Sequence, residues 1–374
     1  MGIFRQIFGM SRGSYKLDAL VSSRVLESGI SSKNSIHVVC DLDKTYVETE
    51  FESWAKMARI PFERPHEKIT VPGASEVLQE LRWGDPSTEK ICKPRSGLHF
   101  VSSSPPQLRS ALEGKLVLDR LDWTSDTFKN QSYNIRMARM DLLRHHIAYK
   151  TRAIFDIVKE IPESSRMWLI GDNAEYDPFV YVGIKLFLEG HATSIIMKSW
   201  LAAAHVESVV IEQVMDLAES LQKRDVQIDG IFIRKLQNYP VVKATPVSDS
   251  IFMFESWFEI GWRWIQAGLI SEESIWRLIR SFHNLHGMSL SHISWAISDF
   301  LTAKDSTTSS LMRSTLTNVL EKFSLAGVKP KKMYSWDLNS VSSLPKNRYV
   351  DIDYAQIAEK WYLSIESAKS LRGK

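Results

Sequence analysis

The stretch VVCDLDKTY, residues 38–46, decides the fold, because an apolar run ends directly on two carboxylates, Asp41 and Asp43. The apolar run predicts a buried β-strand. A buried strand does not tolerate unpaired charges, so something must neutralise the two acids. Either a salt bridge or a metal ion would do so, and the rest of the chain has to supply one of them.

Three further apolar runs predict strands at 97–101, 166–170 and 193–197. Short apolar runs alternate with helical patterns from residue 35 to about 200, which is typical of an α/β domain with a parallel sheet. Three of the four strands end in polar clusters: DLDKT, SSSPPQL and GDNAEYDP. Ligands bind beyond the carboxyl ends of strands in such sheets. The three clusters are therefore expected to converge on one active-site crevice.

Composition suggests three segments. Residues 1–34 predict an N-terminal extension with a Ser-rich linker, SSRVLESGISSKNS; residues 35–202 form the α/β core; and residues 203–374 predict a helical, Trp-rich region. Eight of the 12 tryptophans lie from Trp200 onward.

Charge and apolar patterning suggest the setting in which the chain works. The net charge of +3 provides no general field for nucleic acid. The chain has two cysteines and no run of 18 apolar residues, so we expect a reducing, cytoplasmic location without a membrane span.

The polar clusters contain what phosphoryl transfer needs. Asp41 can attack phosphorus as a nucleophile, and Asp43 can protonate the leaving oxygen and then deprotonate water. Hydroxyl and backbone N–H groups at residues 102–104 suit phosphate oxygens, and Lys150, expected just before a helix, balances their charge. Asp172 and Asp41 together would hold Mg²⁺. Asp177 precedes Pro178 and either caps the next helix or serves the metal site.

The order and spacing of these residues resemble the four-motif signature of the haloacid dehalogenase superfamily of phosphatases. The intervals are 61 residues from Asp41 to Ser102, 48 to Lys150, 22 to Asp172 and 5 to Asp177. The resemblance implies a Rossmann-like parallel sheet. No inserted segment is long enough for a large cap domain: residues 46–96 predict a helix from Tyr46 to Arg59, a loop and a core helix.

FVSSSPPQL and LIGDNAEYDP are similar, more narrowly, to motifs of the actin-patch-associated phosphatidate phosphatase family. That resemblance implies Mg²⁺-dependent hydrolysis of phosphatidate to diacylglycerol and phosphate. Carried onto this sequence, it makes Asp41 the nucleophile and Asp43 the acid/base. The implied phosphate ligands are Thr45, Ser102, Ser103 and Lys150, and the implied metal ligands are Asp41, Asp43, Asp172 and Asp177.

This chain departs from the family pattern at three positions. Lys44 stands where many relatives have Asp, and Asn173 and Ala174 stand where relatives usually have Ser and Gly. These departures put substrate identity in doubt more than catalysis. A soluble phosphomonoester or a phosphoprotein is therefore an alternative substrate, and a non-catalytic binding protein is a further alternative.

Two segments are candidates for contact with an anionic membrane. The basic stretch 136–152, which includes His145 and His146, is either a solvated helix face or a membrane-facing patch. The Trp-rich stretch 252–270 is either a buried core helix or an interfacial surface.

Overall fold

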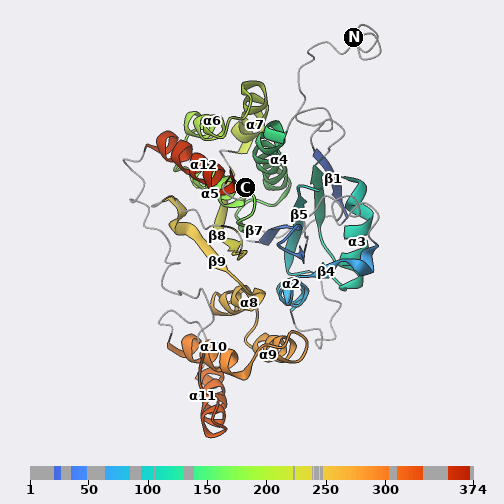
Figure 1. The fold of residues 1–374 in the computed structure, drawn as a ribbon, viewed down its shortest axis with the longest axis vertical. Coiled ribbons are helices and arrows are strands. Elements are labelled where there is room, and N and C mark those ends of the chain that lie inside the picture. Colours follow the sequence, from blue (N-terminus) through green and yellow to red (C-terminus); the bar gives the residue numbers. More distant parts are fainter. Residues whose placement is uncertain are drawn as a thin grey trace.

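The computed structural model describes residues 21–26, 35–48, 64–84, 94–104, 106–129, 139–221, 224–237, 239, 244, 247–302, 310–331 and 353–370. Its centre is a seven-stranded sheet, with strand order β1-β6-β5-β2-β7-β8-β9 (Figure 1). The strands are β1 (Val21–Val25), β2 (Ile36–Asp41), β5 (Ser96–Ser102), β6 (Ser125–Lys129), β7 (Ser165–Asp172), β8 (Val226–Arg234) and β9 (Ile251–Phe254).

Every neighbouring pair in the sheet is parallel except β1 with β6. The chain leaves β2 to form β5 and β6 on one side, then crosses to form β7, β8 and β9 on the other. The direction of winding thus reverses beside β2, which is the strand that ends at Asp41. Crevices at such switch points are where open α/β sheets bind ligands.

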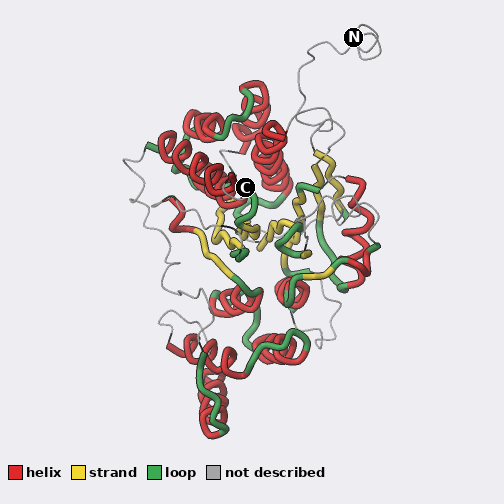
Figure 2. Tube along the Cα trace, viewed as in Figure 1, coloured by secondary structure: helices red, strands yellow, loops and turns green. Residues whose placement is uncertain are grey.

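Helices cover both faces of the sheet, which confirms the predicted α/β class (Figure 2). Because side chains alternate along a strand, Val39 and Leu169 enter one core while Cys40 and Ile170 enter the other. The first core is closed by α4 (Arg139–Glu160), α5 (Asp177–Leu188), α6 (Ser194–Ala203), α7 (Ser208–Leu221) and α12 (Tyr354–Ser370).

The second core is closed by α2 (Ala74–Trp83), α3 (Arg109–Leu118) and α8 (Trp257–Gln266), and is continued by α9 (Ser274–Asn284), α10 (Leu290–Thr302) and α11 (Ser310–Leu325). Trp257, Trp262 and Trp264 of α8 are fully buried in it. The prediction of a buried core helix is therefore confirmed for residues 257–266, whereas residues 252–254 of the same stretch belong to β9. Among the described residues, no helix is long and apolar enough to cross a bilayer.

The prediction of a strand at 193–197 is wrong, because these residues form the start of α6. Thr193 caps that helix, its hydroxyl accepting a hydrogen bond from the Ile196 backbone N–H at 3.4 Å. Met197, Trp200 and Leu201 face the core at helical spacing, while Ile195 is 77% exposed. The run is thus half of an amphipathic helix, which short apolar stretches do not distinguish from a strand.

The sheet extends past both expected segment boundaries, 34/35 and 202/203. β1 lies in the expected N-terminal extension and overlaps the expected linker, and β8 and β9 lie beyond residue 202. β6 lies between α3 and α4. The helix expected from Tyr46 does not begin there, because Val47–Glu48 forms β3, which pairs with β4 (Ile69–Thr70). Residues 49–59 of that expected helix lie outside the described residues.

A chain of buried polar side chains crosses the opposite, amino-terminal edge of the sheet. His37 Nε2 lies 2.9 Å from Ser35 Oγ, and His37 Nδ1 lies 3.1 Å from His99 Nε2. His99 Nδ1 in turn lies 2.7 Å from Ser125 Oγ. Burial, and then the nearby Arg82 guanidinium, lowers the pKa of His37 to about 4. Burial, followed by His37, also lowers the pKa of His99 well below its usual value.

These histidines predict a loss of stability in mild acid. An unfolded histidine binds a proton below about pH 6.5, whereas folded His37 stays neutral down to about pH 4. The stabilisation is complete above pH 6.5 and falls as the pH drops toward 4, by up to about 1.4 kcal/mol per pH unit for each histidine. The free energy of unfolding, measured with denaturant at several pH values from 4.5 to 7, should depend less steeply on pH for His37→Asn than for the parent chain. Equal slopes would contradict this assignment.

Candidate active site

Three carboxylates meet at the carboxyl edge of the sheet. Asp41 ends β2, Asp172 ends β7, and Asp177 begins α5. One oxygen of each lies within 4.8 Å of the others, and all three residues are at most 1% exposed. The expected convergence of distant motifs is thus found at this edge.

Lys150 joins two of these acids. Its Nζ donates to Asp41 Oδ1 at 3.0 Å and also to Asp177 Oδ1. The sequence predicted that Lys150 precedes a helix. This prediction is wrong, because Lys150 lies in the middle of α4. Because α4 packs on the sheet, the helix delivers the ammonium group rigidly into the crevice.

Gly171 permits the close approach of Asp177. A Cβ atom at position 171 would lie 2.2 Å from Asp177 Oδ2, which is closer than any real contact. Asp177 Oδ2 accepts from the Asp172 backbone N–H at 3.3 Å and from the Tyr181 hydroxyl at 3.5 Å. The helix cap is Tyr176, without a capping side chain, so Asp177 is turned into the site rather than toward the helix end.

The loop after β7 presents Asp172 to the crevice. Asp172 Oδ1 accepts from the backbone N–H groups of Ala174 and Glu175, at 2.5 and 3.3 Å. These bonds fix the orientation of the carboxylate. Such local turns are a standard use of aspartate at a loop start.

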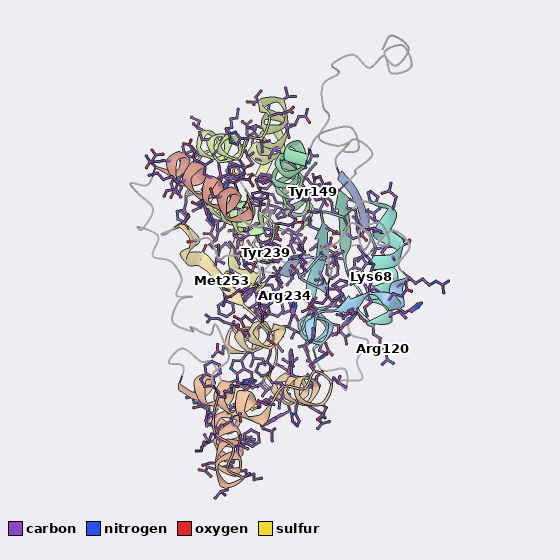
Figure 3. The ribbon with its side chains drawn as sticks, viewed as in Figure 1. Lys68, Arg120, Tyr149, Arg234, Tyr239 and Met253 are labelled. Atoms are coloured by element: carbon purple, nitrogen blue, oxygen red, sulfur yellow. The ribbon has the colours of Figure 1, made fainter. Side chains whose placement is uncertain are left out.

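Two of the three departures from the family pattern contact residues that follow β8, Leu236 and Tyr239. Asn173 Nδ2 donates to the Tyr239 carbonyl at 2.8 Å, and Asn173 Oδ1 accepts from the Leu236 N–H at 2.9 Å. Lys44, at a φ of 60°, donates to the Tyr239 hydroxyl at 3.0 Å. Tyr239 is labelled beside Arg234 in Figure 3. The Arg234 guanidinium donates a hydrogen bond to the Lys44 carbonyl at 2.5 Å. The segment after β8 therefore lies against both carboxylate loops.

Asp43 lies outside the group of three carboxylates. Its Oδ2 accepts from the Ser102 and Ser104 hydroxyls at 3.0 and 2.7 Å, so this oxygen faces the β5 loop. Ser102 also accepts from the Ser104 N–H at 3.0 Å. Of the four expected metal ligands the structure brings three together, and Ser102, an expected phosphate ligand, orients Asp43. Ser104 acts through its side chain, not only as a backbone donor.

Thr45 fits the expected phosphate site. Its hydroxyl oxygen is buried and has no hydrogen-bond partner among the described residues. A buried hydroxyl without a partner is costly, and a phosphate oxygen would satisfy it. Ser103, the other expected hydroxyl, donates to Glu175 Oε2 at 3.1 Å.

Burial and mutual repulsion raise the pKa values of the acids. Burial, followed by repulsion from Asp177, raises the pKa of Asp172 to about 7. Burial likewise raises the pKa of Asp41 well above its usual value, although Lys150 opposes the rise. Burial alone would lower the pKa of Lys150, but Asp177 and Asp41 outweigh it and hold that pKa well above its usual value. One ammonium group thus faces more negative charge than it can balance.

The donor set fits a hard divalent cation. Three buried carboxylates outnumber the one lysine paired with them, and a cluster of carboxylate oxygens is the kind of ligand set that Mg²⁺ prefers. A cation at this position would remove the repulsion that raises the pKa of Asp172. Asp41, Asp172 and Asp177 are therefore the residues that could hold it.

Sequence reasoning missed three residues of the site: Glu175, His146 and Lys129. Glu175 Oε2 lies 3.4 Å from His146 Nδ1 and 3.3 Å from Lys150 Nζ. Lys129, the last residue of β6, is fully buried at the same sheet edge. Glu175 stands between Asp172 and Asp177 in the fourth motif, which is the one signal that could have identified it.

The basic stretch 136–152 does not behave as a uniform solvated face. His146 is half-buried beside Glu175, Lys150 is buried, and Arg152 pairs with Asp156 at 2.8 Å. Residues 136–138 lie outside the described residues, and so do the side chains of 139–145, including His145.

One comparison with known proteins gives a match. Residues 36–199 match the model of a family described as phosphatidate phosphatase APP1, catalytic domain. No curated protein and no solved structure matches the chain. The matched range begins at β2 and spans the four motifs, which confirms the resemblance expected from them.

Proposed function

We propose that the chain is a Mg²⁺-dependent phosphatidate phosphatase acting through an aspartyl phosphate. Its residues 36–199 match the model of the phosphatidate phosphatase APP1 catalytic domain family, and this match supports a phosphoric monoester hydrolase. The observation that carries the proposal further is the buried group Asp41, Asp172 and Asp177, joined by Lys150.

Asp41 is the nucleophile of the proposed reaction. Its carboxylate oxygen attacks phosphorus, the bond from phosphorus to the ester oxygen breaks, and the proton of Asp43 in its acid form passes to the leaving alcohol. Water then attacks phosphorus, Asp43 takes its proton, and the bond from phosphorus to Asp41 breaks to release phosphate. Ser102 and Ser104 hold Asp43 in position for both proton transfers.

The phosphate group is bound by the remaining residues of the crevice. Lys150 and the Thr45 hydroxyl face its oxygens, and backbone N–H groups of the β5 loop add further donors. Mg²⁺, held by Asp41, Asp172 and Asp177, would neutralise negative charge on the phosphate. Lys150, Thr45 and the backbone N–H groups of the β5 loop orient the phosphate against Asp41.

The proposed substrate class rests on the matched family and on the elements found between the motifs. The matched family is described as a phosphatidate phosphatase, and the described segments between the motifs form sheet-packed elements rather than a cap. A site without a cap domain among the described segments between the motifs is suited to a phosphate carried on a large group, such as a lipid in a bilayer. We place the enzyme in the cytoplasm, at the surface of an anionic membrane.

The test measures phosphate release from short-chain phosphatidate and from a soluble aryl phosphate, with Mg²⁺ and with excess chelator. We expect strong preference for the lipid and a complete, reversible loss of turnover with chelator. Turnover of the aryl ester alone would retain the chemistry and refute the lipid substrate. A chelator-resistant rate would refute the metal site, and hydrolysis of neither substrate would favour a binding protein.

A further inference from the structure

Three donors converge on one oxygen at the side of the carboxylate group. Glu175 Oε2 accepts from the Ser103 hydroxyl at 3.1 Å and lies 3.3 Å from Lys150 Nζ. The same oxygen lies 3.4 Å from His146 Nδ1. A hydroxyl, an ammonium group and an imidazole around one negatively charged oxygen form an oxyanion site, and here a side chain of the protein occupies it.

The donors are held by the fold. Ser103 follows β5, while His146 and Lys150 lie one turn apart on α4. Lys129 ends β6, which is parallel to β5 and hydrogen-bonded to it, so its ammonium group belongs to the same edge. Lys129 attracts Glu175 and repels His146 and Lys150.

Solvent reaches the Glu175 side chain more than it reaches those of His146 and Lys150: the three side chains are 27%, 20% and 2% exposed. Glu175 lies in the loop between β7 and α5, so its carboxylate can turn outward without opening the core. The donors that it would leave include Ser103 and Lys150, both of which the sequence assigns to the substrate phosphate.

We propose that the Glu175 carboxylate is an internal competitor of the substrate phosphate: it occupies one oxygen position of the phosphate site and leaves when phosphate binds. His146 and Lys129 then serve as additional donors to the bound phosphate. The inference rests on the proposed function, because the displacing anion is the phosphate group of the substrate or product. Return of Glu175 after hydrolysis would help to expel inorganic phosphate.

The test uses inorganic phosphate as the probe and calorimetric binding as the measurement, on the full chain in saturating Mg²⁺. Glu175→Gln keeps the shape and an acceptor oxygen but removes the charge that competes with phosphate. We expect it to bind phosphate about tenfold tighter than the parent chain. Glu212→Gln, which neutralises an exposed acid paired with Lys198, is the matched control and should bind like the parent.

Equal or weaker phosphate binding by folded Glu175→Gln would overturn the inference, as would the absence of binding to both chains. If the variant does not fold, the parent chain still provides a test. Its ring ¹⁵N signal from His146, assigned with His146→Asn, must shift when phosphate displaces Glu175. An unshifted signal at saturating phosphate would overturn the inference.

These measurements separate the inference from the proposed function, because neither requires turnover. If Glu175→Gln binds phosphate more tightly but the parent chain does not hydrolyse phosphatidate, the proposed function is refuted and the inference about Glu175 stands. If the parent chain hydrolyses phosphatidate but Glu175→Gln binds phosphate with unchanged affinity, the function stands and the inference is refuted.

Discussion

Replacing Asp41 with asparagine is expected to lower kcat for phosphate release by about 10⁴-fold or more, with the fold intact. The amide cannot attack phosphorus, and it removes one of the three carboxylates that would hold the metal. The fold should survive because the variant relieves repulsion among Asp41, Asp172 and Asp177, while Lys150 keeps Asp177 as its partner. Initial rates with Mg²⁺, together with thermal unfolding, test both parts.

The matched control is Asp156→Asn. Asp156 lies on α4 and pairs with Arg152, away from the carboxylate group, so this variant should retain the parental rate. Trapping of phosphate on the protein provides a second readout. Acid-quenched parent chain should carry covalent phosphate during turnover, and Asp41→Asn should carry none. A near-parental rate in Asp41→Asn would refute the covalent mechanism.

Lys150→Met is expected to destabilise the protein by about 3–5 kcal/mol when Mg²⁺ is absent, and to abolish activity. Methionine keeps most of the aliphatic volume but leaves Asp41 and Asp177 buried without a positive partner. Removing one member of a buried ion pair costs more than the pair contributes, because the remaining charge is left unsolvated. Denaturant unfolding in chelator measures this loss directly.

Mg²⁺ distinguishes lost charge balance from lost packing in this variant. The site of Lys150→Met carries one more negative charge, so Mg²⁺ should raise its Tm by more than it raises that of the parent chain. Lys198→Met, which breaks a pair with Glu212 on the surface, is the control and should unfold like the parent. If Mg²⁺ raised both Tm values equally, Lys150 would not be the charge that balances the metal site.

The core of the fold was predictable where local sequence reflects burial. The strands β2, β5 and β7 are buried on both faces, so each reads as a continuous apolar run followed by a polar loop. Two of the strands that sequence reasoning missed, β1 and β8, lack an unbroken apolar run. β1 is an edge strand with two serines and an arginine, and β8 contains Asp229 and Gly230. Pairing with neighbours, rather than local composition, makes them strands.

The sequence by itself determined the chemistry of the site: which acids, which lysine, and their order along the chain. Those features follow from residue types and from the rule that parallel strand ends share one edge. Only the tertiary structure decided which side chains touch. It directed Asp43 toward Ser102 and Ser104, seated Lys150 between Asp41 and Asp177, and placed Glu175 among cationic groups from α4 and β6. The physical reason is that these contacts join residues far apart in the sequence: Lys150 is 27 positions from Asp177 and 109 positions from Asp41. The packing of helices on the sheet sets the distances between such residues, and no local sequence pattern encodes that packing.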